Sequence, residues 1–361
     1  MRRPSFLLSL SLPLCSTLLA TACDDGRGST SGFADRQVII DYADQVVIPT
    51  YALLAERTVA LDAALATLAQ APTTGSLAGA RAAWIAMRVP WEQSETFLFG
   101  PVSAQGWDPA MDSWPLNRTD LDAVLGSADA LTQAYIRNLP ETQKGFHTIE
   151  YLLWGTASNK QPGAFTAREL EYLGGLSDEL VLITRDLAAS WTTGFDGLPA
   201  YREVLVTAGE GSTAYPSLGA AAQELLGGMS AICDEVANGK IADPYDARDP
   251  NLVESQFSFN SIVDFQDNLR GVGNVYLGGV TLAGTAGRGL TVHVASLDPA
   301  LDARVRSELE TAVAAIGAIP APFRTAIQEP ANDATIEAAQ AAIRTLQATI
   351  DGDLSTLVLG P

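Results

Sequence analysis

The sequence predicts an all-α protein built from two packed helical-bundle domains. Apolar residues recur every three or four positions along most of the chain, which is the spacing of one face of an α-helix. No alternation of apolar and polar residues continues long enough to require a strand, and only residues 290–294 hint at one. With 361 residues and 47% hydrophobic content, the chain can form two cores of ordinary size. We place the N-terminal bundle over 37–160 and the C-terminal bundle over 161–361.

Proline and glycine residues divide the helical pattern into segments. The first helix extends from about residue 37 to residue 70 and ends before a Pro-Thr-Thr-Gly turn. Pro90 interrupts the second helix, because it removes a backbone donor and restricts the residue before it. Residues 99–120 contain three prolines, which predict an irregular loop. The remaining predicted helices cover residues 127–139, 145–155, 166–191, 218–238, 261–278, 301–316 and 335–357.

The first 22 residues have the features of a secretory signal. Two arginines precede an apolar run over residues 6–19, and small residues precede Cys23. Small residues directly before a cysteine resemble a bacterial lipobox, which implies lipid attachment at Cys23 and removal of residues 1–22. The alternative is an ordinary secreted protein cut after Ala22. We therefore expect the chain in the bacterial cell envelope, in the periplasm or facing the surface, followed by a flexible polar tether over 23–36.

Charge and cysteine content limit the partners and the cross-links of the chain. The net charge is −20, and loss of residues 1–22 would remove two arginines and no acid, leaving about −22. Such a field disfavours nucleic acids and anionic lipid surfaces, so the lipid anchor is the only membrane contact that we expect. With Cys15 removed and Cys23 lipidated, Cys233 would remain alone and no intrachain disulfide could form.

A G-x-H-x-x-E motif lies at Gly145, His147 and Glu150. The chain has only two histidines, and this one shares a helix face with Glu150, because positions three apart lie on the same side. Phe146 and Ile149 belong to an apolar stripe that would bury the helix beside the pair. A nitrogen and an oxygen ligand placed together could coordinate a transition metal. The alternative is a core histidine that a helical neighbour satisfies.

Glu92 and Glu95 repeat this spacing on another predicted helix. Two such helices packed face to face would bring three carboxylates and one imidazole together, as in metal sites at the centre of helix bundles. This ligand set suits iron or manganese and tolerates zinc or calcium. Two alternatives stay open here. Glu92 could form a surface ion pair with Arg88, and Arg88 could either orient Glu92 or Glu95 or bind an anionic substrate group.

A third segment is dense in hydrogen-bonding side chains. These groups could cap a helix that starts near Ser261, or they could line the cleft between the domains opposite the histidine. The candidate residues in this segment are Ser255, Ser258, Asp264 and Asn268.

Three separated segments resemble the imelysin peptidase family. They are residues 82–101, the G-x-H-x-x-E core with its Leu-Leu-Trp-Gly tail, and residues 254–269. The resemblance implies an all-α fold of two bundle-like domains, with the site near the G-x-H-x-x-E helix. Similar proteins are periplasmic or surface proteins, often lipoproteins, associated with iron uptake. Asp112 resembles an acidic position that metal-binding relatives use, and it joins His147, Glu150, Glu92 and Glu95 as a candidate metal ligand.

These observations favour a lipid-anchored, metal-binding envelope protein that acts in iron acquisition or handling. Iron is the expected ion, zinc and calcium are alternatives, and membrane components of iron uptake are the expected partners. A metallopeptidase, in which His147 and Glu150 hold a zinc-bound water, is the second hypothesis. One histidine is few for a catalytic zinc, and no evident general base accompanies the motif, so we favour a protein that is not an enzyme. A metal-independent module that binds a peptide or partner is the third.

Overall fold

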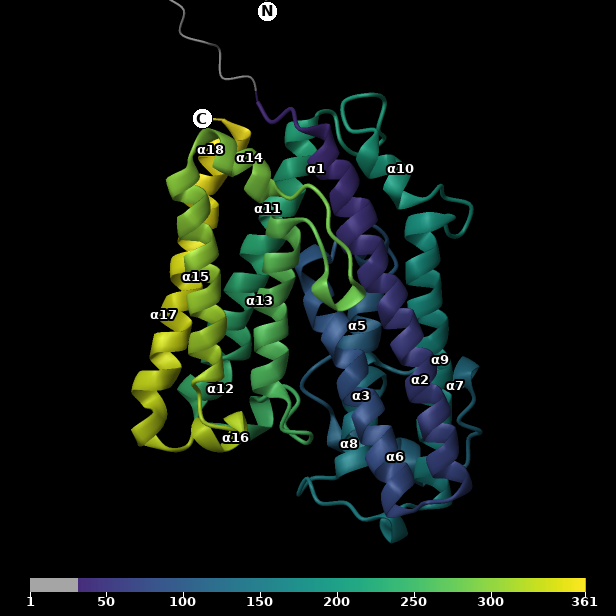
Figure 1. The fold of residues 1–361 in the computed structure, drawn as a ribbon. Coiled ribbons are helices and arrows are strands. Elements are labelled where there is room, and N and C mark those ends of the chain that lie inside the picture. Colours follow the sequence, from purple (N-terminus) through teal and green to yellow (C-terminus); the bar gives the residue numbers. More distant parts are fainter. Residues whose placement is uncertain (1–31, 361) are drawn as a thin grey trace, which may run out of the picture. The chain divides into compact units, whose positions relative to one another are not determined.

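The computed structural model describes residues 32–360, and every regular element within this range is helical (Figure 1). The all-α prediction is therefore confirmed. An isolated β-bridge between Phe195 and Leu198 is the one extended pairing recorded among these residues. The predicted signal over 1–22 and the predicted lipidation site, Cys23, lie outside the described residues.

A first group of helices surrounds α2 (Ile48–Gln70), which packs against both α3 (Thr74–Ser94) and α9 (Ala167–Thr192). Capping boxes begin two of them, because Thr73 and Thr166 each exchange hydrogen bonds with the residue three positions later. The shorter helices of this group are α1 (Arg36–Asp41), η1 (Tyr42–Val47), α4 (Pro101–Ala104), α5 (Trp107–Asp112), α6 (Arg118–Gly126), α7 (Gln133–Arg137), η3 (Glu141–Gln143), α8 (Gly145–Trp154), η4 (Pro162–Ala164) and α10 (Tyr201–Val206).

A second group contains α11 (Leu218–Asp234), α13 (Ser261–Leu277), α15 (Pro299–Gly317) and α17 (Asp333–Thr349). Here α15 packs against α13 and α17, and α11 packs against the same two helices. These contacts make a helical bundle, and its buried apolar residues belong to the same hydrophobic cluster as those of the first group. The shorter helices of this group are η5 (Glu235–Lys240), α12 (Ala242–Ala247), η6 (Pro250–Leu252), η7 (Thr281–Ala283), α14 (Leu290–Leu297), α16 (Phe323–Ala326), η8 (Pro330–Asn332), η9 (Ile350–Leu354) and α18 (Ser355–Leu359).

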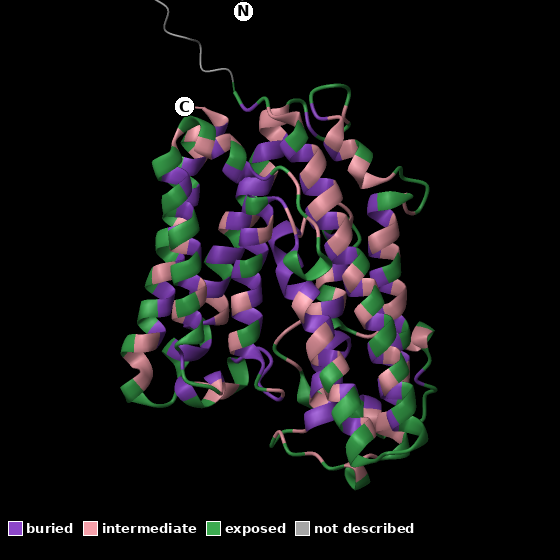
Figure 2. Ribbon diagram, viewed as in Figure 1, coloured by how far each residue is buried: buried purple, intermediate pink, exposed green. Residues whose placement is uncertain are grey.

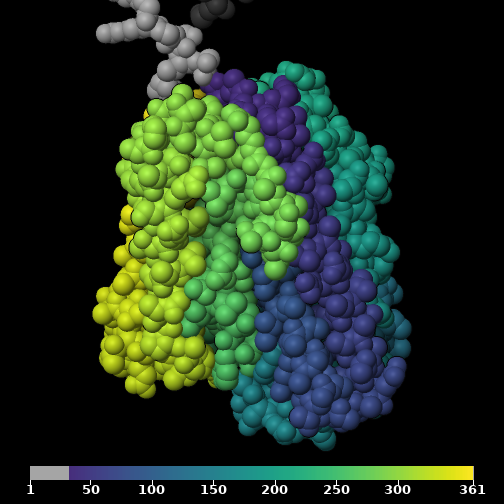
Figure 3. All heavy atoms as spheres, viewed as in Figure 1, coloured from purple at the N-terminus to yellow at the C-terminus, as the bar shows by residue number. Residues whose placement is uncertain are grey.

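The two groups meet along α3 and α13, and the short helix η2 (Glu95–Phe97) at the end of α3 packs against α11. Buried residues gather on the facing sides of these helices (Figure 2). Residues 278–289 cross from the second group to the first (Figure 3), and Thr285 Oγ1 donates a hydrogen bond of 2.5 Å to the carbonyl of Gln45. The C-terminal end of α3 thus lies between the two groups.

The described residues 32–360 belong to one compact unit, so the predicted domain boundary at residue 160 stays a prediction. Helix α9 follows that boundary in sequence, yet it packs against α2 and α8 of the first group. Its N-terminal capping box starts it directly after the loop that we chose as the boundary. Helix α9 is therefore grouped with α2 by its contacts, although it follows residue 160 in the sequence.

Three local predictions were wrong. Residues 99–120 were expected to be irregular, but they contain α4 and α5, because prolines are tolerated in the first turn of a helix. Residues 127–139 were expected to be one helix, but only Gln133–Arg137 is helical there. The segment 290–294 was the hint of a strand, but it forms part of α14, since short apolar runs do not distinguish buried helices from strands.

Candidate metal centre

Helix α8 begins in close contact with the end of α5. Its first residue, Gly145, has a φ of 80°, in the left-handed region that favours glycine. A Cβ at this position would lie 2.1 Å from the carbonyl oxygen of Met111. A larger residue would therefore push α8 away from α5. The glycine of the motif brings Asp112, the last residue of α5, beside the first turn of α8, which carries His147.

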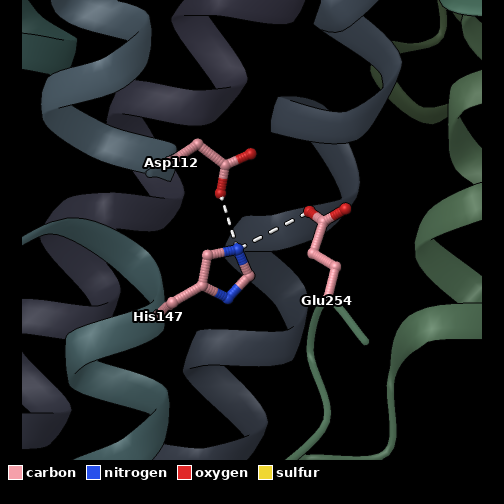
Figure 4. Close-up of side chains that lie close together, drawn as sticks. All are labelled: Asp112, His147 and Glu254. Atoms are coloured by element: carbon pink, nitrogen blue, oxygen red, sulfur yellow. Dashed lines mark ion pairs between the residues drawn. The ribbon is translucent and has the colours of Figure 1, made fainter. Parts of the chain in front are cut away.

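His147 is completely buried among three acidic side chains. Its Nε2 lies 3.1 Å from Asp112 Oδ1 and 3.5 Å from Glu254 Oε1 (Figure 4). Its Nδ1 lies 3.1 Å from Glu150 Oε2. Neither carboxylate at Nε2 is aligned for a hydrogen bond, so this nitrogen has no hydrogen-bond partner among the described residues. The helical neighbour thus satisfies one ring nitrogen and leaves the other facing two carboxylates.

Glu150 is held firmly behind the imidazole ring. Its Oε1 accepts hydrogen bonds from the backbone N–H of Phe257 at 3.0 Å and from the N–H and Oγ of Ser258, both at 2.7 Å. With Oε1 occupied in this way, Oε2 accepts the proton of His147 Nδ1. This arrangement turns the lone pair of a neutral imidazole to Nε2. Glu150 is thus placed to orient His147, and its predicted role as a metal ligand stays a prediction.

Arg88 lies fully buried at the centre of the acidic cluster. Its guanidinium pairs with Asp112, with Glu92, and with Glu254 Oε1 at 2.8 Å, and Asp264 Oδ2 lies 3.8 Å away. The i, i+4 pair with Glu92 is thus buried, where a surface pair was the alternative that the sequence left open. Since all four neighbours are carboxylates of this chain, the guanidinium orients acidic side chains.

A second cation, Lys240, reaches the other side of the cluster. Its Nζ lies 2.7 Å from Glu95 Oε2, 3.3 Å from Glu92 Oε2 and 3.2 Å from Glu254 Oε2. The amide nitrogen of Asn268 donates hydrogen bonds to the same oxygens of Glu92, at 2.8 Å, and Glu95, at 2.5 Å. The predicted candidates Glu92, Glu95 and Asn268 are therefore brought together.

The polar segment before α13 lines the cluster. Ser255 Oγ donates a 2.5 Å hydrogen bond to Asp264 Oδ2, and Ser258 binds Glu150 as described above. Asn260 is the N-cap of α13, but no side-chain hydrogen bond caps this helix. Of the two interpretations that the sequence left open, the structure supports the one in which these side chains lie opposite the histidine.

A cavity of about 610 Å³ opens beside the cluster. Six of its lining residues are acidic, and Lys240 is the basic one. Trp114, which packs edge-on to the His147 ring with 4.9 Å between centroids, contributes part of the apolar wall. A cation that enters this cavity would meet a strongly negative surface. The lining residues are Glu95, Leu98, Asp108, Pro109, Asp112, Ser113, Trp114, Pro115, Glu235, Gly239, Lys240, Asp243, Leu252 and Glu254.

Buried charge separates the carboxylates into two kinds. Burial opposes ionisation of Asp112, but Arg88 and His147 outweigh it and lower the pKa of this carboxyl. Burial likewise opposes ionisation of Glu254, and Lys240 and His147 lower its pKa. Burial by itself lowers the pKa of His147, because it favours the neutral ring. The adjacent carboxylates outweigh this effect and raise the pKa well above its usual range. The acidic neighbours thus favour the protonated form of the ring.

The remaining buried acids lack enough positive charge. Burial and the charge of Glu92 raise the pKa of both Glu95 and Asp264 well above the usual range. Arg88 and Lys240 offset only part of the negative charge that Glu92, Glu95, Asp112, Glu254 and Asp264 bring together. An added cation would lower the free energy of their ionised forms. The cluster therefore fits a metal ion both in its donor atoms and in its charge.

The possible metal ligands form two overlapping sets. Asp112, His147 and Glu254 can each offer one atom within 4.8 Å of the others, and so can Glu92, Glu95 and Asp112. Four of the five predicted ligands thus fall in these sets, and Glu150 stands behind His147. Glu254 and Lys240 were missed by the sequence prediction. Glu254 opens the polar segment that the sequence singled out, but Lys240 had no comparable signal.

Comparison with known proteins places these features in a family. The family model Imelysin matches residues 47–350. Iron-regulated protein A from Synechococcus elongatus is 33% identical over 353 residues, which cover 96% of this chain and 95% of the relative. A crystal structure described as an iron-regulated protein A precursor from Parabacteroides distasonis has a TM-score of 0.82 and 27% identity, covering 90% of this chain and 94% of that one.

A second solved structure supports the fold alone. An imelysin-like protein from Psychrobacter arcticus has a TM-score of 0.72 at 16% identity, covering 91% of this chain and 98% of that one. At such low identity the likeness shows the arrangement of the helices alone.

Proposed function

The chain belongs to the imelysin family, and from this premise we propose that it is an envelope protein that binds a metal ion at the His147 cluster and acts in iron acquisition or handling. One observation carries the proposal. A fully buried imidazole has its Nδ1 committed to Glu150, while its Nε2 has no hydrogen-bond partner and faces Asp112 and Glu254. A histidine that donates its other N–H to a carboxylate is the usual arrangement of a metal-binding histidine.

The donor atoms favour a hard or borderline ion. His147 would supply one nitrogen, and Asp112 and Glu254 would supply oxygens, with Glu92 and Glu95 close by. Such ligation suits iron or manganese and also admits zinc or calcium. We propose iron, because the relatives from Synechococcus elongatus and Parabacteroides distasonis are both described as iron-regulated protein A. When bound, the ion would supply positive charge to a cluster in which carboxylates outnumber the basic side chains.

The position of the protein in the cell is a further part of this proposal. The signal-like residues 1–22 and the lipobox-like Cys23 support a lipid-anchored protein of the cell envelope. Membrane components of iron uptake are the partners that we propose for it. The net charge of −20 supports partners that present positive charge or a cation.

Metal analysis of tag-free protein, followed by calorimetric titration with iron(II), manganese or zinc, tests the proposal. His147→Ala should weaken binding roughly tenfold or more, because it removes the only nitrogen ligand of the cluster. His293→Ala is the matched control, since the other histidine lies in α14 against Phe33. Each bound ion should also release a proton from His147, so the measured enthalpy should vary with the ionisation enthalpy of the buffer.

Two results would decide against the proposal. Parent and His147→Ala proteins that bind every ion equally, or not at all, would leave His147 as a structural residue of the core. Metal-dependent cleavage of peptides by the same preparation would instead favour the metallopeptidase hypothesis. Circular dichroism on each sample separates loss of binding from loss of folding.

A further inference from the structure

We infer that Lys240 is an internal counter-cation that an incoming divalent metal ion must displace, so that this lysine sets the affinity of the cluster for cations. The inference rests on the proposed metal-binding function and deepens it. It concerns the oxygen-rich half of the cluster, formed by Glu92, Glu95 and Glu254, which the ammonium group now holds.

The ammonium group is bound as a small cation would be. Three carboxylates from separate segments, the end of α3, helix η2 and the segment after η6, converge on Nζ within 2.7–3.3 Å. A divalent ion bound by the same oxygens would draw them to about 2.0–2.6 Å. Glu254 also faces His147 Nε2. A metal ion bound at His147 would therefore compete with the ammonium of Lys240 for the carboxylate of Glu254. The ammonium and the metal ion cannot both have the full set of ligands.

Lys240 lies where a cation would enter. It is the basic residue among those that line the 610 Å³ cavity, together with its partners Glu95 and Glu254. Its side chain is 9% exposed, whereas Arg88 is fully buried and does not line the cavity. Of the two internal cations, Lys240 is therefore the one in reach of solvent. An ion from the cavity would meet this ammonium first.

A lysine side chain also suits exchange. Its ammonium is a compact point charge on a flexible stem, whereas the planar guanidinium of Arg88 is fixed by several carboxylates. Glu235 and Asp243 line the same cavity and could receive the displaced ammonium. Asn268 would stay in place beside Glu92 and Glu95, and its Oδ1 is buried with no hydrogen-bond partner among the described residues. Exchange therefore needs movement of one side chain.

Lys240→Met tests this role, because methionine keeps an unbranched apolar stem of similar reach and removes the charge. The variant should bind manganese or zinc at least tenfold more tightly than the parent in calorimetric titration. Its Tm in EDTA should fall, since three carboxylates lose their counter-ion, and should recover when manganese is added. Lys240→Arg should not gain affinity, because the charge remains. Lys160→Met is the matched control, since this lysine pairs with Glu169, which is not part of the cluster.

A second variant keeps the test decisive if Lys240→Met folds poorly in EDTA. In the double variant Lys240→Met, Glu95→Gln one excess negative charge is removed, so the Tm should recover without metal while the gain in affinity is lost.

The outcomes separate this inference from the function on which it rests. If the parent binds metal and Lys240→Met binds it no more tightly, the inference is overturned and the proposed function stands. If the parent binds no metal and Lys240→Met does, the internal cation is supported and the proposed function fails. If neither protein binds metal, both are overturned.

Discussion

Glu150 gives the clearest view of the site at the scale of single residues. It shares a helix face with His147, as the spacing predicted, but three donors from the segment at Phe257 and Ser258 hold its outer oxygen. Its inner oxygen then controls which ring nitrogen of His147 carries the proton. The motif thus supplies His147, which faces the cluster, and Glu150, which orients His147.

Glu150→Gln should weaken metal binding by roughly tenfold to a hundredfold, the range for loss of a group that orients a ligand. The hydrogen bond to Glu150 helps to raise the pKa of His147, so the variant should also release less proton per bound ion at neutral pH. Calorimetric titration in two buffers of different ionisation enthalpy measures both quantities. A purely structural Glu150 would lower the Tm and leave the proton release per ion unchanged.

Asp108 predicts how stability depends on pH. Burial raises the pKa of Asp108 to about 7, and the charge of Asp112 adds to this effect. Because an unfolded aspartate titrates near pH 4, the native state holds this proton more tightly than the unfolded state. The stability that the proton contributes is complete below about pH 4 and is lost as the pH rises to about 7.

Asp108→Asn should remove this pH-dependent loss of stability, because asparagine does not titrate. The difference in Tm between the variant and the parent should therefore grow from pH 4 to pH 7 and stay constant above it. Asp108 is partly exposed, so the gain in unfolding free energy should be roughly 1–3 kcal/mol at most. Thermal unfolding followed by circular dichroism across this range gives the measurement, with the exposed Asp122→Asn as control. A difference that does not vary with pH would show that Asp108 titrates normally.

At the scale of helices, two glycines bring the end of α3 against the second group. A Cβ on Gly228 of α11 would lie 2.1 Å from the carbonyl oxygen of Thr96, and one on Gly271 of α13 would lie 2.4 Å from that of Gln93. Both helices therefore approach the backbone around Glu95 more closely than any other residue would allow. This approach lets Asn268 of α13 reach Glu92 and Glu95.

Gly228→Ala should lower the unfolding free energy by roughly 1–3 kcal/mol, because the new methyl group forces α11 away from η2. Metal affinity should fall as well, since Glu95 moves relative to Lys240 and Asn268. The neighbouring Gly227 provides a strict control, because a Cβ there meets nothing within 4 Å. Gly227→Ala should be neutral or stabilising by about 0.5–1 kcal/mol. Equal Tm values for the two variants would contradict the close packing.

The success of the sequence prediction also varies from helix to helix, for physical reasons. Long amphipathic helices such as α9 were predicted almost to the residue, since a capping box and a regular apolar stripe define them locally. Helices α5 and α14 were missed because they are short, and their stability comes from neighbours distant in sequence. The grouping of α9 with α2 depends on packing between helices, which spacing along the chain does not contain.

At the scale of the whole molecule, the site combines signals that the sequence keeps apart. Their spacing in the sequence identified His147, Glu92 and Glu95 as candidate ligands, and the family resemblance identified Asp112. The fold brings all four residues together. Lys240 could not be found in this way, because it comes from η5 and meets the cluster only through tertiary structure. The net charge of −20 gave no indication that Arg88 and Lys240 would lie within the acidic cluster.

The anchoring of the whole protein can be tested at Cys23. Cys23→Ser should move the protein from the membrane fraction to the soluble fraction, because a lipid chain would supply most of the membrane affinity and an acidic body supplies none. Fractionation after a salt wash, with Cys233→Ser as control, gives the measurement; Cys233 is buried in α11 and should have no effect. The continuous helical run Arg36–Gln70 is long and apolar enough to span a membrane, but half of its most apolar window is buried. A Cys23→Ser protein that still sediments with membranes would refute the lipid anchor and direct attention to this helical run.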